Sequence, residues 1–172
     1  MLRKIAVVYC RIVEKISEWS GKVLGLLLIP LTLILLYEVI ARYFFENPTI
    51  WAHETSIYLF GFISVMSGAY VLLERAHVTL DLLYAHVSDR KKALLDTIVA
   101  PVFLFTLILM IWKGSVFAVQ SWKILETSST VWNPPLYPIK TVIPLAAVLL
   151  ILQVGAKLIR DIFFVITGKE LT

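Results

Sequence analysis

Four long apolar stretches, separated by short charged connections, dominate this chain. They cover roughly residues 23–45, 50–73, 93–119 and 136–165. At ~1.5 Å of rise per helical residue, each stretch is long enough to cross the ~30 Å hydrocarbon core of a bilayer. The pattern therefore predicts an all-α integral membrane protein with four transmembrane helices, and we expect residues 1–172 to form a single membrane domain.

Residues 1–21, which precede the first apolar stretch, follow a different pattern. Their apolar side chains recur every three or four positions, at Leu2, Ile5, Val8, Ile12, Ile16 and Trp19. The charged residues Arg3, Lys4, Arg11, Lys15 and Glu18 lie largely on the other face, as in helices that lie at the boundary between lipid headgroups and acyl chains. We predict an amphipathic arm helix on the cytoplasmic leaflet; the alternative is that these charges serve only as a topology signal.

The composition agrees with residence in a bilayer. Of the 172 residues, 59% are hydrophobic and 16% are charged, against ~25% charged residues in soluble domains. The formal net charge is +4, but the basic residues cluster at the ends of the apolar stretches, where they meet anionic lipid, so we expect no nucleic-acid binding. A single cysteine excludes an internal disulfide or a pair of redox-active thiols.

The distribution of lysine and arginine predicts an orientation. Twelve of the sixteen lie before the first stretch, between the second and third, or in the C-terminal part of the chain from Lys157 on. Because basic loops stay in the cytoplasm, both termini and the second connection should be cytoplasmic. That connection contains a short amphipathic piece, residues 77–86, which we expect to lie along the inner leaflet.

Three ionisable residues fall inside the first two apolar stretches. Glu38 and Arg42 are four residues apart, a spacing that favours an ion pair on a helix, and a tight turn brings Glu54 to a similar depth. Charged groups at membrane depth are costly and therefore candidates for a function. Three interpretations remain open: packing of the first two helices, docking onto another membrane protein, and a proton or substrate pathway.

Small residues line one face of the second stretch, at Gly61, Ser64 and Gly68. Such a face allows close helix approach, either within the chain or with a partner. Pro101 and Pro144 lie inside the third and fourth stretches, where we expect local kinks.

The outward connection between the third and fourth stretches is rich in aromatic residues and proline. Trp122, Trp132, Pro134, Pro135 and Tyr137 indicate an ordered loop. We expect this loop to contact a partner outside the membrane.

Neither a metal centre nor a catalytic motif is indicated. His53 lies near the outward end of its helix, whereas His77 and His86 lie near the inner side, so these residues cannot share a metal or hold a haem between them. The chain also has no glycine-rich phosphate loop and no serine, histidine and aspartate at matching depth. We therefore expect no enzyme activity, no metal and no cofactor.

Several motifs together resemble a known family. They are Glu38-x-x-x-Arg42-Tyr43-Phe44-Phe45, Trp51-x-x-Glu54, Gly68 to Tyr70, and His77-Val78-x-x-Asp81. In order and spacing, the chain resembles the DctQ-type small membrane subunit of tripartite ATP-independent periplasmic (TRAP) transporters. His53 is a departure, since an acidic residue often stands beside the glutamate in that family.

The resemblance implies a small, non-transporting scaffold subunit in the cytoplasmic membrane of a bacterium or archaeon. A large membrane subunit would carry the substrate and sodium sites, and a periplasmic binding protein would deliver an organic acid, either a carboxylate or a sulfonate. Glu38, Arg42, Trp51 and Glu54 would organise the first hairpin and its contact with the large subunit, and the loop from residue 121 to 140 would meet the periplasmic protein.

The strongest rival is a self-contained, proton-coupled small exporter that uses Glu38. This function requires an unpaired carboxylate facing a cavity. Arg42, one helical turn away, argues against it because a nearby cation keeps a carboxylate ionised and occupied.

Overall fold

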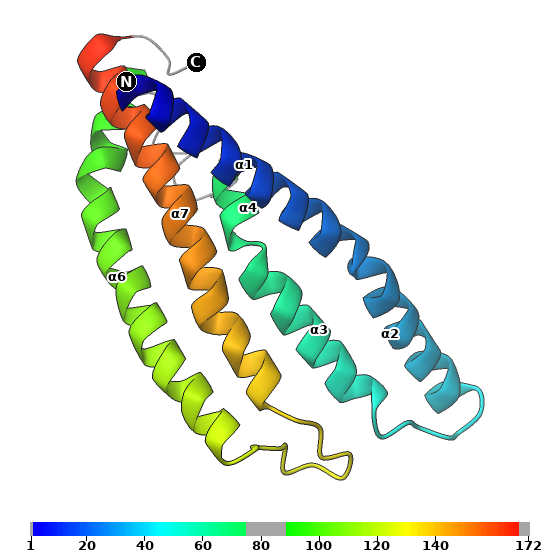
Figure 1. Cartoon of the computed structure of the whole chain (residues 1–172). Coiled ribbons are helices and arrows are strands. Elements are labelled where there is room, and N and C mark those ends of the chain that lie inside the picture. Colours follow the sequence, from blue (N-terminus) through cyan, green and yellow to red (C-terminus); the bar gives the residue numbers. More distant parts are fainter. Residues whose placement is uncertain (1, 75–88, 169–172) are drawn as a thin grey trace.

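The computed structural model describes residues 2–74 and 89–168, which form helices joined by short connections (Figure 1). The helices are α1 (Leu2–Leu26), α2 (Leu28–Tyr43), α3 (Ala52–Met66), α4 (Gly68–Leu73), α6 (Asp89–Lys123) and α7 (Tyr137–Thr167). Four helical lengths are long and apolar enough to cross a membrane: Arg3–Tyr43, Ala52–Leu73, Leu94–Lys123 and Tyr137–Thr167. The predicted all-α fold with four spans is confirmed. The amphipathic piece expected at residues 77–86 lies outside the described residues.

Two antiparallel hairpins make up the bundle. Helix α2 pairs with α3, and α6 pairs closely with α7. Helix α7 is central, because it also contacts α1, α3 and α4, whereas α6 and α2 lie at opposite edges of the bundle (Figure 1). Such a thin bundle leaves long rows of large apolar side chains exposed on most of its helices, a surface suited to lipid or to another membrane protein.

The N-terminal segment does not form a separate arm. Helix α1 continues past Gly21 to Leu26 and leads through the single turn residue Leu27 into α2, and the two helices run in nearly the same direction (Figure 1). The reason lies in the positions of the helix breakers: one glycine lowers helix propensity without ending a helix. Pro30, by contrast, has no N–H to donate to the carbonyl four residues earlier and crowds it, so the interruption falls next to Leu26.

Helix α1 packs on the bundle with a face that is not its apolar row. Cys10, Val13 and Ser17 are buried, and the Tyr9 hydroxyl donates a 3.0 Å hydrogen bond to the carbonyl of Leu152 in α7. The apolar row predicted from the sequence points away from the bundle and is exposed, at Ile5, Val8, Ile12, Ile16 and Trp19. The polar and small side chains of α1 therefore form the contact with α7, and the apolar row stays free.

The second span is interrupted once, at Ser67, between α3 and α4. The Ser67 N–H still donates to the Ile63 carbonyl at 3.0 Å, and the Val71 N–H donates to the Ser67 carbonyl at 2.9 Å. The chain therefore keeps its direction across the break. Helices α6 and α7 continue through Pro101 and Pro144.

Candidate functional site

Glu38 is the centre of a hydrogen-bonded cluster at the turn between α2 and α3. Its Oε1 accepts hydrogen bonds from Arg42, at 3.1 Å from Nε and 2.5 Å from Nη2. Its Oε2 accepts the Thr49 backbone N–H at 3.1 Å and also the Thr49 hydroxyl. Both oxygens of this carboxylate, whose residue is only 8% exposed, are therefore occupied.

Thr49 extends the cluster to the start of α3, because its hydroxyl oxygen accepts the N–H of Ala52 at 3.4 Å. Trp51 lies beside it and stacks on Tyr37 of α2, with ring centroids 5.9 Å apart. Polar and aromatic contacts thus join the end of one helix to the beginning of the next. A side chain held in this way is suited to bracing the hairpin.

Glu54 does not complete the expected trio of charges. Within residues 2–74 and 89–168, Arg42 forms an ion pair with Glu38 and no hydrogen bond or ion pair with Glu54 is found. The Oε2 atom of Glu54 is buried without a hydrogen-bond partner in that part of the chain. Thr49, which precedes α3, is instead the second hydrogen-bonding partner of Glu38.

The two glycines of the second span differ in their surroundings. A Cβ atom added at Gly68 would lie 3.2 Å from Leu150 Cδ1 of α7, whereas one added at Gly61 would meet nothing within 4 Å. Gly68 therefore serves packing within the chain. The surface at Gly61 remains open.

The loop between α6 and α7, which the sequence predicts to face outward, is ordered by its own backbone. Leu136 N–H donates to the Glu126 carbonyl at 2.8 Å, and Ser128 N–H donates to the Pro134 carbonyl at 2.9 Å. Thr127 and Pro135 form an isolated antiparallel bridge. These contacts agree with the ordered loop that the prolines and aromatic residues predict.

Side chains fasten this loop to the helix ends. The Trp122 indole N–H donates to the Thr141 hydroxyl at 2.9 Å, and the rings of Trp122 and Tyr137 lie 4.3 Å apart. Glu126 and Lys140 form an ion pair of 2.5 Å, which lowers the pKa of the Glu126 carboxyl because Lys140 hydrogen-bonds its charged form.

The residues predicted to meet a partner at this loop differ in accessibility. Trp132 and Pro135 are exposed, whereas Pro134 is buried and Tyr137 is half-buried. The neighbouring Val131, which the sequence pattern did not single out, is 89% exposed. Trp122, also in the predicted set, is 47% exposed, and Ile124 and Leu125 are exposed as well, so accessible side chains occur at both ends of the loop.

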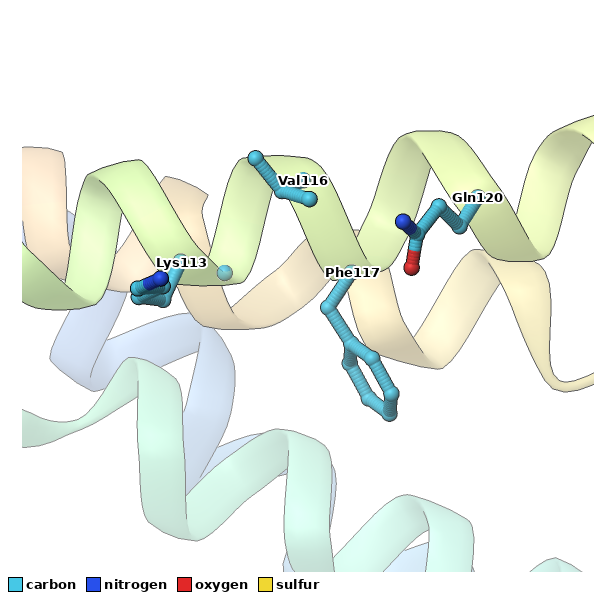
Figure 2. A pocket seen from close by; sticks show the side chains of 5 residues that line it. Lys113, Val116, Phe117 and Gln120 are labelled. Carbon is cyan, nitrogen blue, oxygen red and sulfur yellow. The ribbon is translucent and has the colours of Figure 1, made fainter.

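A further polar position, missed by the sequence analysis, lies on α6. Figure 2 shows Lys113, Phe117 and Gln120 along one side of this helix, where they line a hollow of about 410 Å³ together with Gly114 and Val116. The signal was present in the sequence. A lysine stands inside a long apolar stretch, seven residues before a glutamine.

These features define a polytopic membrane protein in which the Glu38 carboxylate is hydrogen-bonded to Arg42 and Thr49 at the turn between α2 and α3. The family model of the tripartite ATP-independent periplasmic transporters, DctQ component, matches residues 31–164. The chain belongs to this family and is the DctQ subunit of a TRAP transporter, which confirms the resemblance. The family is one of transport proteins, which agrees with the expectation that the chain is not an enzyme.

One curated relative is the sialic acid TRAP transporter permease protein SiaT of Haemophilus influenzae (strain 86-028NP). It is 26% identical to this chain over 87 residues, a stretch that covers 51% of this chain. The same stretch covers 14% of the relative's own length. This chain is therefore similar to a small part of a much longer permease.

Proposed function

We propose that this chain is the non-transporting scaffold subunit of a TRAP transporter that takes up an organic acid. In the proposed complex, a large membrane subunit holds the substrate and carries out sodium-coupled transport, and a periplasmic binding protein delivers a carboxylate or sulfonate. The relative's name specifies sialic acid, an organic acid of this class.

The observation that carries the proposal is the state of Glu38. A transporting carboxylate must exchange its proton or substrate with a cavity, but both oxygens of Glu38 are engaged by Arg42 and Thr49. This arrangement supports a bracing role and speaks against a small exporter that uses Glu38. Together with the family match, it supports a subunit whose task is to hold other parts in place.

Helix α1 supports a finer part of the proposal. Successive helical residues are ~100° apart, so the exposed apolar row of α1 lies roughly opposite the face that packs on α7. Exposed charged residues, including Lys4, Arg11 and Lys15, lie on the side of the helix between these two faces. A 41-residue helical length, Arg3–Tyr43, would measure ~60 Å, about twice the hydrocarbon thickness. We infer that α1 lies at the inner boundary of the cytoplasmic membrane, with both termini in the cytoplasm.

The experiment that tests the proposed function is purification of the tagged chain from its native membrane at native expression. Mass spectrometry should identify a stoichiometric large membrane protein in the mild-detergent extract. Recovery of this chain alone, or only as its own oligomer, would overturn the scaffold function and favour the exporter. The Arg42→Ala variant, which leaves Oε1 of Glu38 without its Arg42 donors, should recover less of the large subunit than the wild type.

A further inference from the structure

Lys113 is a charged residue deep inside a membrane span. Helix α6 carries an interfacial aromatic, Trp122, close to its outward end, and tryptophan favours the headgroup region. Lys113 precedes Trp122 by nine residues, or ~14 Å along the helix, which is about half of a ~30 Å hydrocarbon core. The lysine therefore lies near the middle of the bilayer, too deep for the snorkelling that relieves lysines near helix ends.

This lysine differs from three other cations of its hairpin, which form ion pairs. Lys140 pairs with Glu126, Lys157 with Asp96 at 2.6 Å, and Arg160 with Glu14. Among the described residues, Lys113 has no carboxylate within ion-pair distance, and its Nζ lies 4.4 Å from the centre of the Trp112 ring. Burying a charged lysine in the hydrocarbon core beside an aromatic ring, without a carboxylate, is costly in free energy.

The surroundings of Lys113 suit a helix of another chain. Phe117 and Gln120 follow Lys113 at intervals of four and three residues, so all three lie on one side of α6 beside the hollow (Figure 2). Phe117 is 49% exposed. Gln120 adds a side-chain amide, which hydrogen-bonds across helices in membranes.

We propose that this side of α6 is where a transmembrane helix of the large subunit packs, and that this helix presents an aspartate or glutamate to Lys113. The inference rests on the proposed function. It is argued from charge complementarity: the unpaired cation requires an anion at the same depth, and the partner helix would supply it while filling the hollow beside Phe117. Gln120 would bind a polar group about two helical turns closer to the outward surface than Lys113.

Photo-cross-linking in native membranes tests the surface. A photoreactive amino acid is placed at Phe117, and a matched control is placed at Val119, which is also exposed. The two positions have nearly the same depth but lie ~160° apart around the helix. We expect Phe117 to cross-link to the large subunit and Val119 to lipid; cross-links from Val119 alone, or lipid adducts alone from Phe117, would overturn the proposal.

The charge is tested separately in the tagged full complex. Lys113→Ala should recover about threefold to tenfold less large subunit than the wild type, the range expected for a polar contact between membrane helices. Lys113→Arg should recover a near-normal amount, and so should Lys123→Ala at the end of the same helix. Loss of Lys113 without any change in recovery would overturn the pairing.

The two proposals fail in different ways. A wild-type chain that brings down no large subunit contradicts the proposed function itself. The second case is a wild-type complex that is recovered normally, is recovered equally well with Lys113→Ala, and forms cross-links from another side of α6. That result leaves the scaffold function intact and rejects only this surface.

Discussion

Gly21 of α1 lies directly against the ring of Tyr70 in α4. A Cβ atom added at Gly21 would stand 2.7 Å from Tyr70 Cδ1 and closer still to Cγ. The absence of a side chain at Gly21 therefore lets α1 approach the second span. A residue that weakens the helix locally is used here to bring two helices together.

This contact predicts that Gly21→Val destabilises the protein. The new side chain must displace the whole tyrosine ring, since the clash involves the ring's base, and overpacking of this kind costs about 1–3 kcal/mol. Thermal unfolding of the purified complex should show a lower midpoint. Gly25→Ala is the matched control: nothing lies within 4 Å of its added Cβ, so its midpoint should equal or exceed that of the wild type because alanine favours helix.

A second prediction concerns the buried polar contact between α1 and α7. The Ser17 hydroxyl donates to Gln153 Oε1 at 2.9 Å, and both residues are 3% exposed. Ser17→Ala removes the donor from a buried acceptor, a loss of about 1–3 kcal/mol. The unfolding midpoint should fall. It should change little for Ser20→Ala, because that hydroxyl bonds only to the Ser17 carbonyl of its own helix.

Substitutions in the Glu38 cluster at the turn between α2 and α3 distinguish a bracing function of Glu38 from a proton-carrying one. Glu38→Ala leaves the Thr49 N–H and the Arg42 side chain without their acceptor, so stability should fall by about 1–3 kcal/mol and proteases should cut the turn faster. Thr49→Ser, which keeps the hydroxyl, should resemble the wild type. Transport abolished by Glu38→Gln with unchanged stability would instead support a proton-carrying function for this carboxylate.

The ion pair between Glu126 and Lys140 predicts a pH dependence. Lys140 lowers the pKa of the Glu126 carboxyl below its ordinary value of 4.5. The stabilisation is therefore full above that value and is lost as the pH falls through the lower pKa of the folded state. The midpoint difference between wild type and Glu126→Gln should be present at neutral pH and should disappear in the acid range below 4.5. Glu46→Gln, at the other outward turn, should match the wild type; a Glu126→Gln difference that persists in acid would contradict the prediction.

Orientation is testable because Cys10, which is buried, is the chain's only cysteine. In a Cys10→Ser background, Ser129→Cys in the loop after α6 should react with a membrane-impermeant maleimide added to intact spheroplasts. Glu74→Cys, at the end of α4, should react only after permeabilisation, since the bulk of the basic residues keeps that side in the cytoplasm. The reverse pattern would contradict the assigned orientation.

The spans were predictable because apolar length is a property of the local sequence. The second span was expected at residues 50–73 and is found at Ala52–Leu73, and the close spacing of Glu38 and Arg42 was enough to indicate their ion pair. Thr49 was not predicted as a partner of Glu38, because that contact depends on how the turn folds back over eleven residues. The interruption near Leu26 has a sequence signal in Pro30, whose missing N–H and ring disturb the helix at the carbonyl four residues earlier.

The lengths and spacing of the chain's apolar stretches determine the four spans and their antiparallel order. The placement of the basic residues determines the predicted orientation. These features can be predicted from the sequence because bilayer thickness and backbone hydrogen bonding act on each segment alone. Tertiary structure alone decided which face of each helix is covered. In lipid, both the buried and the exposed faces are apolar, so hydrophobicity does not distinguish them. Only the packed bundle shows that α1 contacts α7 through Tyr9, Cys10 and Ser17, and that Lys113 is left without a carboxylate among the described residues.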